Sequence, residues 1–203
     1  MKVNQHLASR NSIIAIGTST GGPRALEQLL QSIPEDFPSP IVIVQHMPMG
    51  FTKSLAERLN RICSLHVKEA THGEYVERGH VYLAPGDYHM KVRPFGAKLQ
   101  IVLTKEAHYM GHRPSVNMLL NSLTQVKTYK KIVAILTGMG KDGAEGIIQL
   151  CKSDPTTIVI AESKETSTIY GMPKAAVETG YTNCSAALND ISTLLVAYLK
   201  GSE

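Results

Sequence analysis

The chain contains no tryptophan, and aromatic residues make up only 5% of its 203 residues. We therefore expect an aliphatic core built from isoleucine, valine, leucine and alanine. No apolar run approaches the roughly 18 residues that a membrane-spanning helix needs. Residues 1–12 also lack the apolar stretch of an export signal. These absences predict a cytoplasmic protein without membrane insertion.

Cysteine is scarce as well. The three cysteines, Cys63, Cys151 and Cys184, are far apart and show no CxxC spacing, which argues against a disulfide framework or a zinc site and fits a reducing compartment. Cys63 and Cys151 fall on apolar helical stripes, where we expect them to be buried as small hydrophobic residues. The sequence predicts no metal and no cofactor.

Charge is not concentrated anywhere. The formal net charge of +4 is spread along the chain, and the nearest approach to a basic run is Lys130 and Lys131. That patterning argues against nucleic-acid binding. With 43% hydrophobic and 19% charged residues, the composition is typical of a globular protein with a sizeable core.

Short apolar runs alternate with amphipathic helical segments, the pattern of a parallel sheet covered by helices. The predicted strands are residues 13–16, 41–44, 132–136 and 157–161. Helices are predicted after the first three strands, over residues 115–126 and over residues 190–200. Their expected inner stripes are Leu26, Leu29, Leu30 and Ile33; Phe51, Leu55, Leu59 and Ile62; Val116, Leu119, Leu120 and Leu123; Ala144, Ile147, Ile148 and Cys151; and Ile191, Leu194, Leu195 and Tyr198.

The middle of the chain has a different pattern. Residues 81–84, 89–93 and 99–103 are strand-like and are joined by the turn segments 85–87 and 94–96. We expect them to form an antiparallel hairpin excursion. The predicted fold is thus a doubly wound α/β domain with a mainly parallel sheet, over residues 13–203, preceded by a tail or linker remnant over residues 1–12.

Three chemically active side chains follow buried strands of this predicted sheet. Ser19, His46 and Asp142 each lie one to six residues after a strand and just before a helix. Because right-handed crossovers keep the carboxyl ends of parallel strands at one edge, these segments should meet there. The sequence therefore predicts a hydroxyl, an imidazole and a carboxylate in one site.

Each of these residues also has an ordinary structural interpretation. The segment 17–21 fits the G-x-S-x-G nucleophile elbow, but it also suits a purely structural turn or a phosphate-binding turn. His46 alone suits a polar niche, and Asp142 alone suits a helix N-cap. The coincidence of all three favours a triad. Their order in the chain differs from that of α/β-hydrolases, which excludes that family but not the mechanism.

Six segments carry a specific resemblance. IGTSTGGP (16–23), QHMPMGFTKSLAERLN (45–60), HVYLAPGDYHM (80–90), GHRPSVNMLLNSL (111–123), ILTGMGKDGAEG (135–146) and YGMPKAAVETG (170–180) resemble the catalytic domain of the bacterial chemotaxis protein-glutamate methylesterases (CheB type). The resemblance covers nearly the whole chain.

The resemblance implies hydrolysis of glutamate methyl esters on the cytoplasmic helices of chemoreceptors, with release of methanol, and often deamidation of receptor glutamines. It implies that Ser19 is the nucleophile, His46 the acid and base, and Asp142 the carboxylate behind it. Thr20 becomes a pocket residue and the Met139 N–H an oxyanion donor. Arg113 is a candidate for orienting the substrate helix or capping a loop, with a structural salt bridge as an equal alternative.

Some positions depart from the family pattern. Thr18 stands where alanine is common, Asn117 replaces a common aspartate, and residues 162–164 replace a stretch richer in amides and acids. The family usually carries a phosphorylatable receiver domain, for which these 203 residues leave no room. We therefore expect either an excised domain or a stand-alone enzyme, and the sequence does not predict whether phosphorylation controls it.

Three alternatives remain open from the sequence. One is a serine esterase or amidase with another substrate. Another is a phosphate- or nucleotide-binding module, although the chain lacks both G-x-x-x-x-G-K-[ST] and G-x-G-x-x-G. The third is a receptor-binding scaffold without activity.

Overall fold

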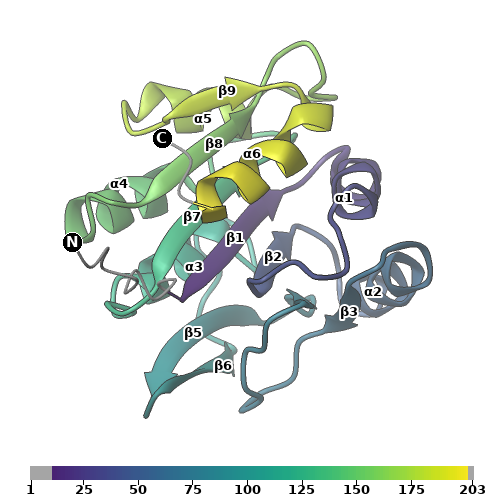
Figure 1. The fold of residues 1–203 in the computed structure, drawn as a ribbon, viewed down its shortest axis with the longest axis vertical. Coiled ribbons are helices and arrows are strands. Elements are labelled where there is room, and N and C mark those ends of the chain that lie inside the picture. The colour runs from purple at the N-terminus through teal and green to yellow at the C-terminus, as the bar shows by residue number, and fades with distance from the viewer. Residues whose placement is uncertain (1–10, 201–203) are drawn as a thin grey trace, which may run out of the picture.

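A computed structural model of the protein describes residues 11–200. Its main sheet has seven strands, all parallel, in the order β3-β4-β2-β1-β7-β8-β9. These strands are β1 (Ser12–Thr18), β2 (Ile41–Gln45), β3 (His66–Glu69), β4 (His80–Leu83), β7 (Lys130–Ile135), β8 (Ile158–Glu162) and β9 (Cys184–Ala186). Figure 1 shows β2, β1, β7, β8 and β9 side by side.

Helices cover both faces of this sheet. One core cluster joins the sheet to α1, α2 and α6, and the other joins it to α3, α4 and α5. Along β1, Ile14 and Ile16 belong to the first cluster, whereas Ile13 and Ala15 belong to the second. This alternation explains why the strand is apolar throughout. The helices are α1 (Gly22–Gln31), α2 (Phe51–Ile62), α3 (Val116–Leu123), α4 (Ala144–Ser153), α5 (Met172–Glu178) and α6 (Leu188–Lys200).

The predicted doubly wound α/β fold is confirmed, and so is its antiparallel hairpin. Strands β5 (His89–Phe95) and β6 (Lys98–Thr104) pair antiparallel and form a sheet of their own. The hairpin packs against α3, where the Ser122 hydroxyl accepts the N–H of Val92 at 2.9 Å. Its buried residues join the core on the α3 side of the main sheet.

One predicted strand lies in a different sheet from the one expected. The turn signals place residues 81–84 in the antiparallel excursion, but β4 lies in the main sheet and pairs parallel with β2 and β3. The following segment, with Gly86, is not a hairpin turn. A Cβ on Gly86 would lie 2.3 Å from the backbone nitrogen of Met49. This glycine is therefore required for close packing against the loop after β2.

Several expectations at the ends of elements are also wrong. The helical period places Phe51 and Ile62 on the inner stripe of α2, yet they are 64% and 40% exposed because they are its first and last residues. Cys63 lies just after α2 and is only half-buried, whereas Cys151 is buried as predicted. Four other residues of the predicted inner stripes are only partly buried: Ala144, Ile148, Leu194 and Tyr198. Leu194 and Tyr198 nevertheless pack against the core.

The tail predicted for residues 1–12 falls mostly outside the described residues. Ser12 itself belongs to β1, where it pairs with Lys130 of β7. Within residues 11–200, no helix combines the length and the apolar character needed to cross a membrane.

Candidate active site

The three candidate residues lie at the carboxyl edge of the central strands. Thr18 of β1 pairs with Gln45 of β2, so Ser19 and His46 are the next residues along two adjacent strands. The His46 N–H donates to the Thr18 carbonyl at 3.1 Å, and neighbouring parallel strands lie about 4.8 Å apart. Asp142 comes from the loop after β7, the other neighbour of β1.

The carboxylate of Asp142 is nearly fully buried and accepts hydrogen bonds on both oxygens. Oδ2 accepts from Nε2 of His46 and from the N–H of Val116, each at 2.7 Å. Oδ1 accepts from the Ser115 hydroxyl at 2.9 Å and from the Asn117 N–H at 3.0 Å. Since Val116 and Asn117 begin α3, the carboxylate lies at a helix N-terminus, where free N–H groups and the helix dipole favour negative charge.

These donors determine the charge of Asp142. Burial alone would raise the pKa of its carboxyl group. The hydrogen bond from His46 and the N–H groups of Asn117 and Val116 outweigh burial, and the pKa is lowered from its ordinary value of 3.8. Asp142 is therefore an anion at neutral pH.

His46 is oriented by its bond to Asp142. A carboxylate can only accept, so Nε2 of His46 carries the proton of this bond and Nδ1 is free to act as a base. Nδ1 is buried and has no hydrogen-bond partner within residues 11–200. The structure does not join it to Ser19, whose hydroxyl likewise makes no hydrogen bond within the described residues.

A tight turn holds Ser19 between β1 and α1. Gly21 has a φ of 84°, a conformation that suits glycine, and the Gly22 N–H donates to the Ser19 carbonyl at 2.8 Å. The Ser19 N–H and the Thr18 hydroxyl both donate to the Thr137 carbonyl, at 3.0 and 2.8 Å. The threonine found in place of the common alanine thus adds a bond that ties the turn to the loop after β7.

Gln45 connects the serine segment to the histidine segment. Its side-chain Nε2 donates to the carbonyls of both Ser19 and His46, each at 3.0 Å. A Cβ on Gly22 would lie only 1.9 Å from Oε1 of Gln45. Only glycine at position 22 leaves room for the Gln45 amide. The hydrogen bond from Gln45 to the serine turn therefore requires glycine at this position.

The loop after β7 packs directly against the serine turn. A Cβ on Gly138 would lie 2.9 Å from Cβ of Ser19. The next residue, Met139, is 71% exposed, and neither its N–H nor that of exposed Thr20 donates a hydrogen bond within residues 11–200. Two backbone donors near Ser19 are therefore available to a bound molecule.

Arg113 is occupied by partners within the protein. Its guanidinium forms an ion pair with Asp87 and also donates to the carbonyls of Lys105, at 3.3 Å, and Glu106, at 3.0 Å. The side chain is 16% exposed. These contacts favour the structural salt bridge over a role in orienting a substrate.

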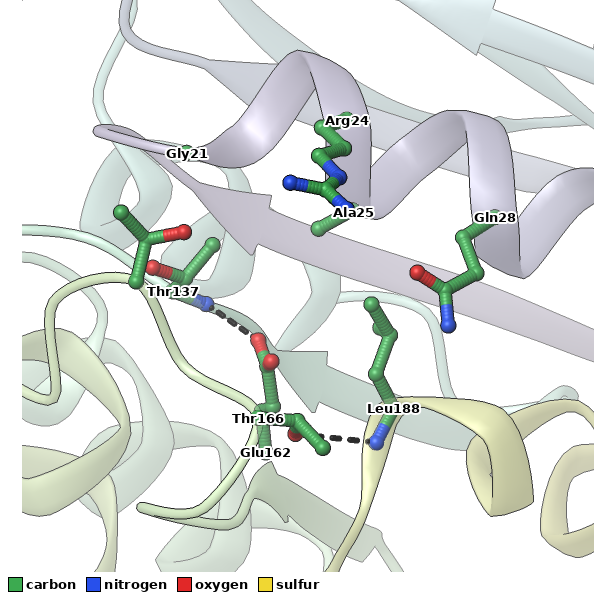
Figure 2. A pocket seen from close by; sticks show the side chains of 9 residues that line it. Gly21, Arg24, Ala25, Gln28, Thr137, Glu162, Thr166 and Leu188 are labelled. Carbon is green, nitrogen blue, oxygen red and sulfur yellow. Dashed lines mark hydrogen bonds between the residues drawn. The ribbon is translucent and has the colours of Figure 1, made fainter.

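A cavity of about 230 Å³ lies beside the serine turn, where Gly21 and Thr137 contribute to its wall and neither His46 nor Asp142 does (Figure 2). Glu162, the last residue of β8, is fully buried there and accepts the Thr137 N–H at 2.7 Å. Burial raises the pKa of the Glu162 carboxyl group, although the Thr137 N–H and a neighbouring hydroxyl favour its charged form. Glu162 thus supports the loop to which the serine turn is bonded.

Several residues that organise this site escape prediction from the sequence. Gln45 and Glu162 each end an apolar strand, and a polar residue in that position is the signal that could identify them. Ser115 is of a residue type that caps helices, but nothing in the sequence indicates its contact with Asp142. Within the described residues, no group of three or more His, Cys, Asp or Glu side chains could hold a metal ion.

The fold and this arrangement define a class of protein: a doubly wound α/β protein with the components of a serine-histidine-aspartate hydrolase at the carboxyl edge of its sheet. The family model described as CheB methylesterase matches residues 14–195. The chain belongs to the CheB methylesterase family.

Individual relatives agree with this assignment. The chain is 52% identical over 197 residues to a protein-glutamate methylesterase/protein-glutamine glutaminase of Oceanobacillus iheyensis, an alignment that covers 97% of this chain and 56% of that protein. A protein with the same name from Thermotoga maritima is 47% identical over 174 residues, covering 86% of this chain and 50% of that protein. The chain thus spans about half the length of the curated relatives it matches.

A solved structure supports the fold. The crystal structure of the Thermotoga maritima CheB methylesterase catalytic domain superposes with a TM-score of 0.88 at 43% sequence identity. The match covers 93% of this chain and 98% of that domain.

Proposed function

We propose that the chain is a serine hydrolase that removes methyl groups from glutamate methyl esters on chemoreceptor helices and also deamidates glutamine side chains. The observation that carries the proposal is the buried His46–Asp142 hydrogen bond, 2.7 Å long, at the strand end next to Ser19. The names of the relatives from Oceanobacillus iheyensis and Thermotoga maritima include both activities.

The proposed reaction uses Ser19, His46 and Asp142 in three roles. Oγ of Ser19 attacks the ester carbonyl carbon while Nδ1 of His46 takes the hydroxyl proton, and Asp142 stabilises the resulting imidazolium. The bond to the methoxy oxygen then breaks, and His46 gives the proton to the departing methanol. Water, deprotonated by His46, attacks the acyl-enzyme, the bond to Oγ of Ser19 breaks, and His46 returns its proton to Oγ as the glutamate side chain is released. In deamidation, ammonia leaves in place of methanol.

Two backbone groups are suited to stabilise the negative charge that develops on the carbonyl oxygen. The N–H groups of Met139 and Thr20 have no acceptor within residues 11–200. Thr20 follows Ser19 in the chain, and Met139 follows Gly138, which packs against Ser19. One oxyanion donor typically contributes about 3 kcal/mol to transition-state stabilisation. We assign this role to both groups.

The surface around the site suits a helical protein substrate. Met49, Phe51 and Met139 are 68%, 64% and 71% exposed and come from the two segments that also carry His46 and Asp142. Flexible methionines and an aromatic ring are typical of surfaces that accept the apolar face of an amphipathic helix. The proposed partner is therefore the cytoplasmic helical region of a chemoreceptor, which places the reaction in the cytoplasm.

The test is methanol release from methylated receptor fragments, compared between the wild type, Ser19→Ala and the exposed control Ser32→Ala. We expect Ser19→Ala to abolish release, with a melting temperature within a few degrees of the wild type, while Ser32→Ala stays active. Turnover of p-nitrophenyl acetate without methanol release would indicate an esterase with another substrate. Methanol release by Ser19→Ala would show that Ser19 is not the nucleophile.

A further inference from the structure

A second histidine lies flat against the proposed base. The ring of His112 stacks on the ring of His46 with 3.9 Å between centroids and 6° between planes. The His46 side chain is only 8% exposed. Nε2 of His46 is bonded to Asp142, and one face of its ring is covered by His112.

The backbone that carries His112 is fixed on both sides. Tyr109 and His112 exchange two backbone hydrogen bonds, of 3.0 and 2.9 Å, which close a tight turn before the ring. The next residue, Arg113, is anchored by its ion pair with Asp87 and by two backbone carbonyls. The fold therefore fixes the backbone from which the His112 ring reaches His46.

His112 is suited to remain neutral beside a charged His46. Burial, followed by the neighbouring His46, lowers the pKa of His112. The other charged groups that face it are Asp142, which opposes this shift, and His108, which adds to it. When His46 takes the serine proton, a neutral flat ring therefore covers the imidazolium, an arrangement that favours the cation.

We propose that His112 is a positioning residue for His46. Its ring holds the His46 plane in the orientation in which Nε2 meets Asp142 and Nδ1 is left without a partner, and it keeps water away from one face of the imidazole. The kinetic part of this inference rests on the function proposed above, whereas the geometric part can be tested without turnover.

The geometric test uses Ser19→Ala as the background, so that no reaction interferes. Solution NMR follows the proton shared by Nε2 of His46 and Asp142, which should give a slowly exchanging downfield signal. We expect the signal to persist in His112→Phe, which keeps a flat ring, and to broaden or disappear in His112→Ala. His112→Leu, which fills space without a flat ring, should behave as the alanine variant does. An unchanged signal in both the alanine and the leucine variants would overturn the proposal.

The kinetic test compares the same three substitutions in the active protein. A misoriented base lowers the rate of the chemical step, so kcat should fall on the order of tenfold in His112→Ala and His112→Leu, with KM changed less than about twofold. His112→Phe should retain kcat within about threefold of the wild type. Failure of phenylalanine to restore kcat, or normal kcat in all three variants, would contradict the positioning role. A wild type that releases no methanol would refute the proposed function. The NMR experiment would still test whether the His112 ring orients His46.

Discussion

The carboxylate of Asp142 binds Nε2 of His46 while it also accepts the two backbone N–H groups that begin α3. One side chain thus orients the imidazole and caps a helix supplied by a different part of the chain. Because four donors converge on it, both oxygens must accept, and only a carboxylate can satisfy them all.

Asp142→Asn should therefore impair both activity and stability. An asparagine amide has one acceptor oxygen, so its NH₂ group must face either the His46–Val116 pair or the Ser115–Asn117 pair of donors. When it faces His46, the imidazole is forced into the tautomer with the proton on Nδ1, which cannot accept the serine proton. We expect kcat to fall about 10⁴-fold with little change in KM.

The stability effect of the same substitution has a separate cause. A buried donor left without an acceptor costs about 1–3 kcal/mol, and chemical denaturation should show a loss of that size. Asp190→Asn, at the start of α6 and far along the chain from the site, is the control and should leave kcat unchanged. An Asp142→Asn variant with near wild-type kcat would mean that the acid has been assigned wrongly.

Ser115→Ala should produce a smaller effect of the same kind. The Ser115 hydroxyl donates to Asp142 and accepts the Met118 N–H as the N-cap of α3. Its removal should lower the free energy of unfolding by about 1 kcal/mol. It also leaves Asp142 with one donor fewer, so kcat should fall, but less than in Asp142→Asn. Parallel denaturation and rate measurements would check both effects, and a stability loss with unchanged kcat would limit Ser115 to helix capping.

The sequence is sufficient to predict the central parallel strands because each is a continuous apolar run followed by an amphipathic helix. It is not sufficient for the edge strands. In β3 only Val67 is fully buried, and β9 has three residues, so neither shows a clear pattern. Strand β4 is placed in the wrong sheet because Pro85 and Gly86 resemble a hairpin turn, whereas the close approach to Met49 can only be seen in three dimensions.

In the site, too, local sequence patterns predict some residues, whereas others are found only from tertiary packing. Ser19, His46 and Asp142 are predictable because each follows a strand, and parallel topology brings strand ends together. Their roles remain predictions. The supporting contacts are not predictable, because Gln45 and His112 act through neighbours that only tertiary packing provides.

Gly138→Ala should disturb the serine turn by direct contact. The new Cβ would lie 2.4 Å from Sδ of Met172 and 2.9 Å from Cβ of Ser19. Overpacking of this kind typically costs about 1–3 kcal/mol, and a displaced Ser19 should lower kcat as well.

Gly96→Ala is the matched control, because Gly96 has a φ of 59° and a Cβ added there would have no other atom within 4 Å. It should cost about 1 kcal/mol of stability through backbone strain and leave kcat unchanged. Equal kcat in both variants would argue against the close contact with Ser19.

Glu162→Gln should stabilise the protein in a pH-dependent way. Because the pKa of Glu162 is raised above its ordinary value of 4.5 in the folded state, ionisation is less favourable there than in the unfolded chain. The free energy of unfolding of the wild type therefore decreases as pH rises from about 4.5 through the folded pKa, and stays lower above it.

Glutamine at position 162 keeps an acceptor for the Thr137 N–H but carries no charge. We expect the variant to melt at a higher temperature than the wild type at pH 8, and the difference to vanish below about pH 4. Glu57→Gln, at an exposed position on α2, should show no such trend, and a pH-independent difference for Glu162→Gln would rule out ionisation as its cause.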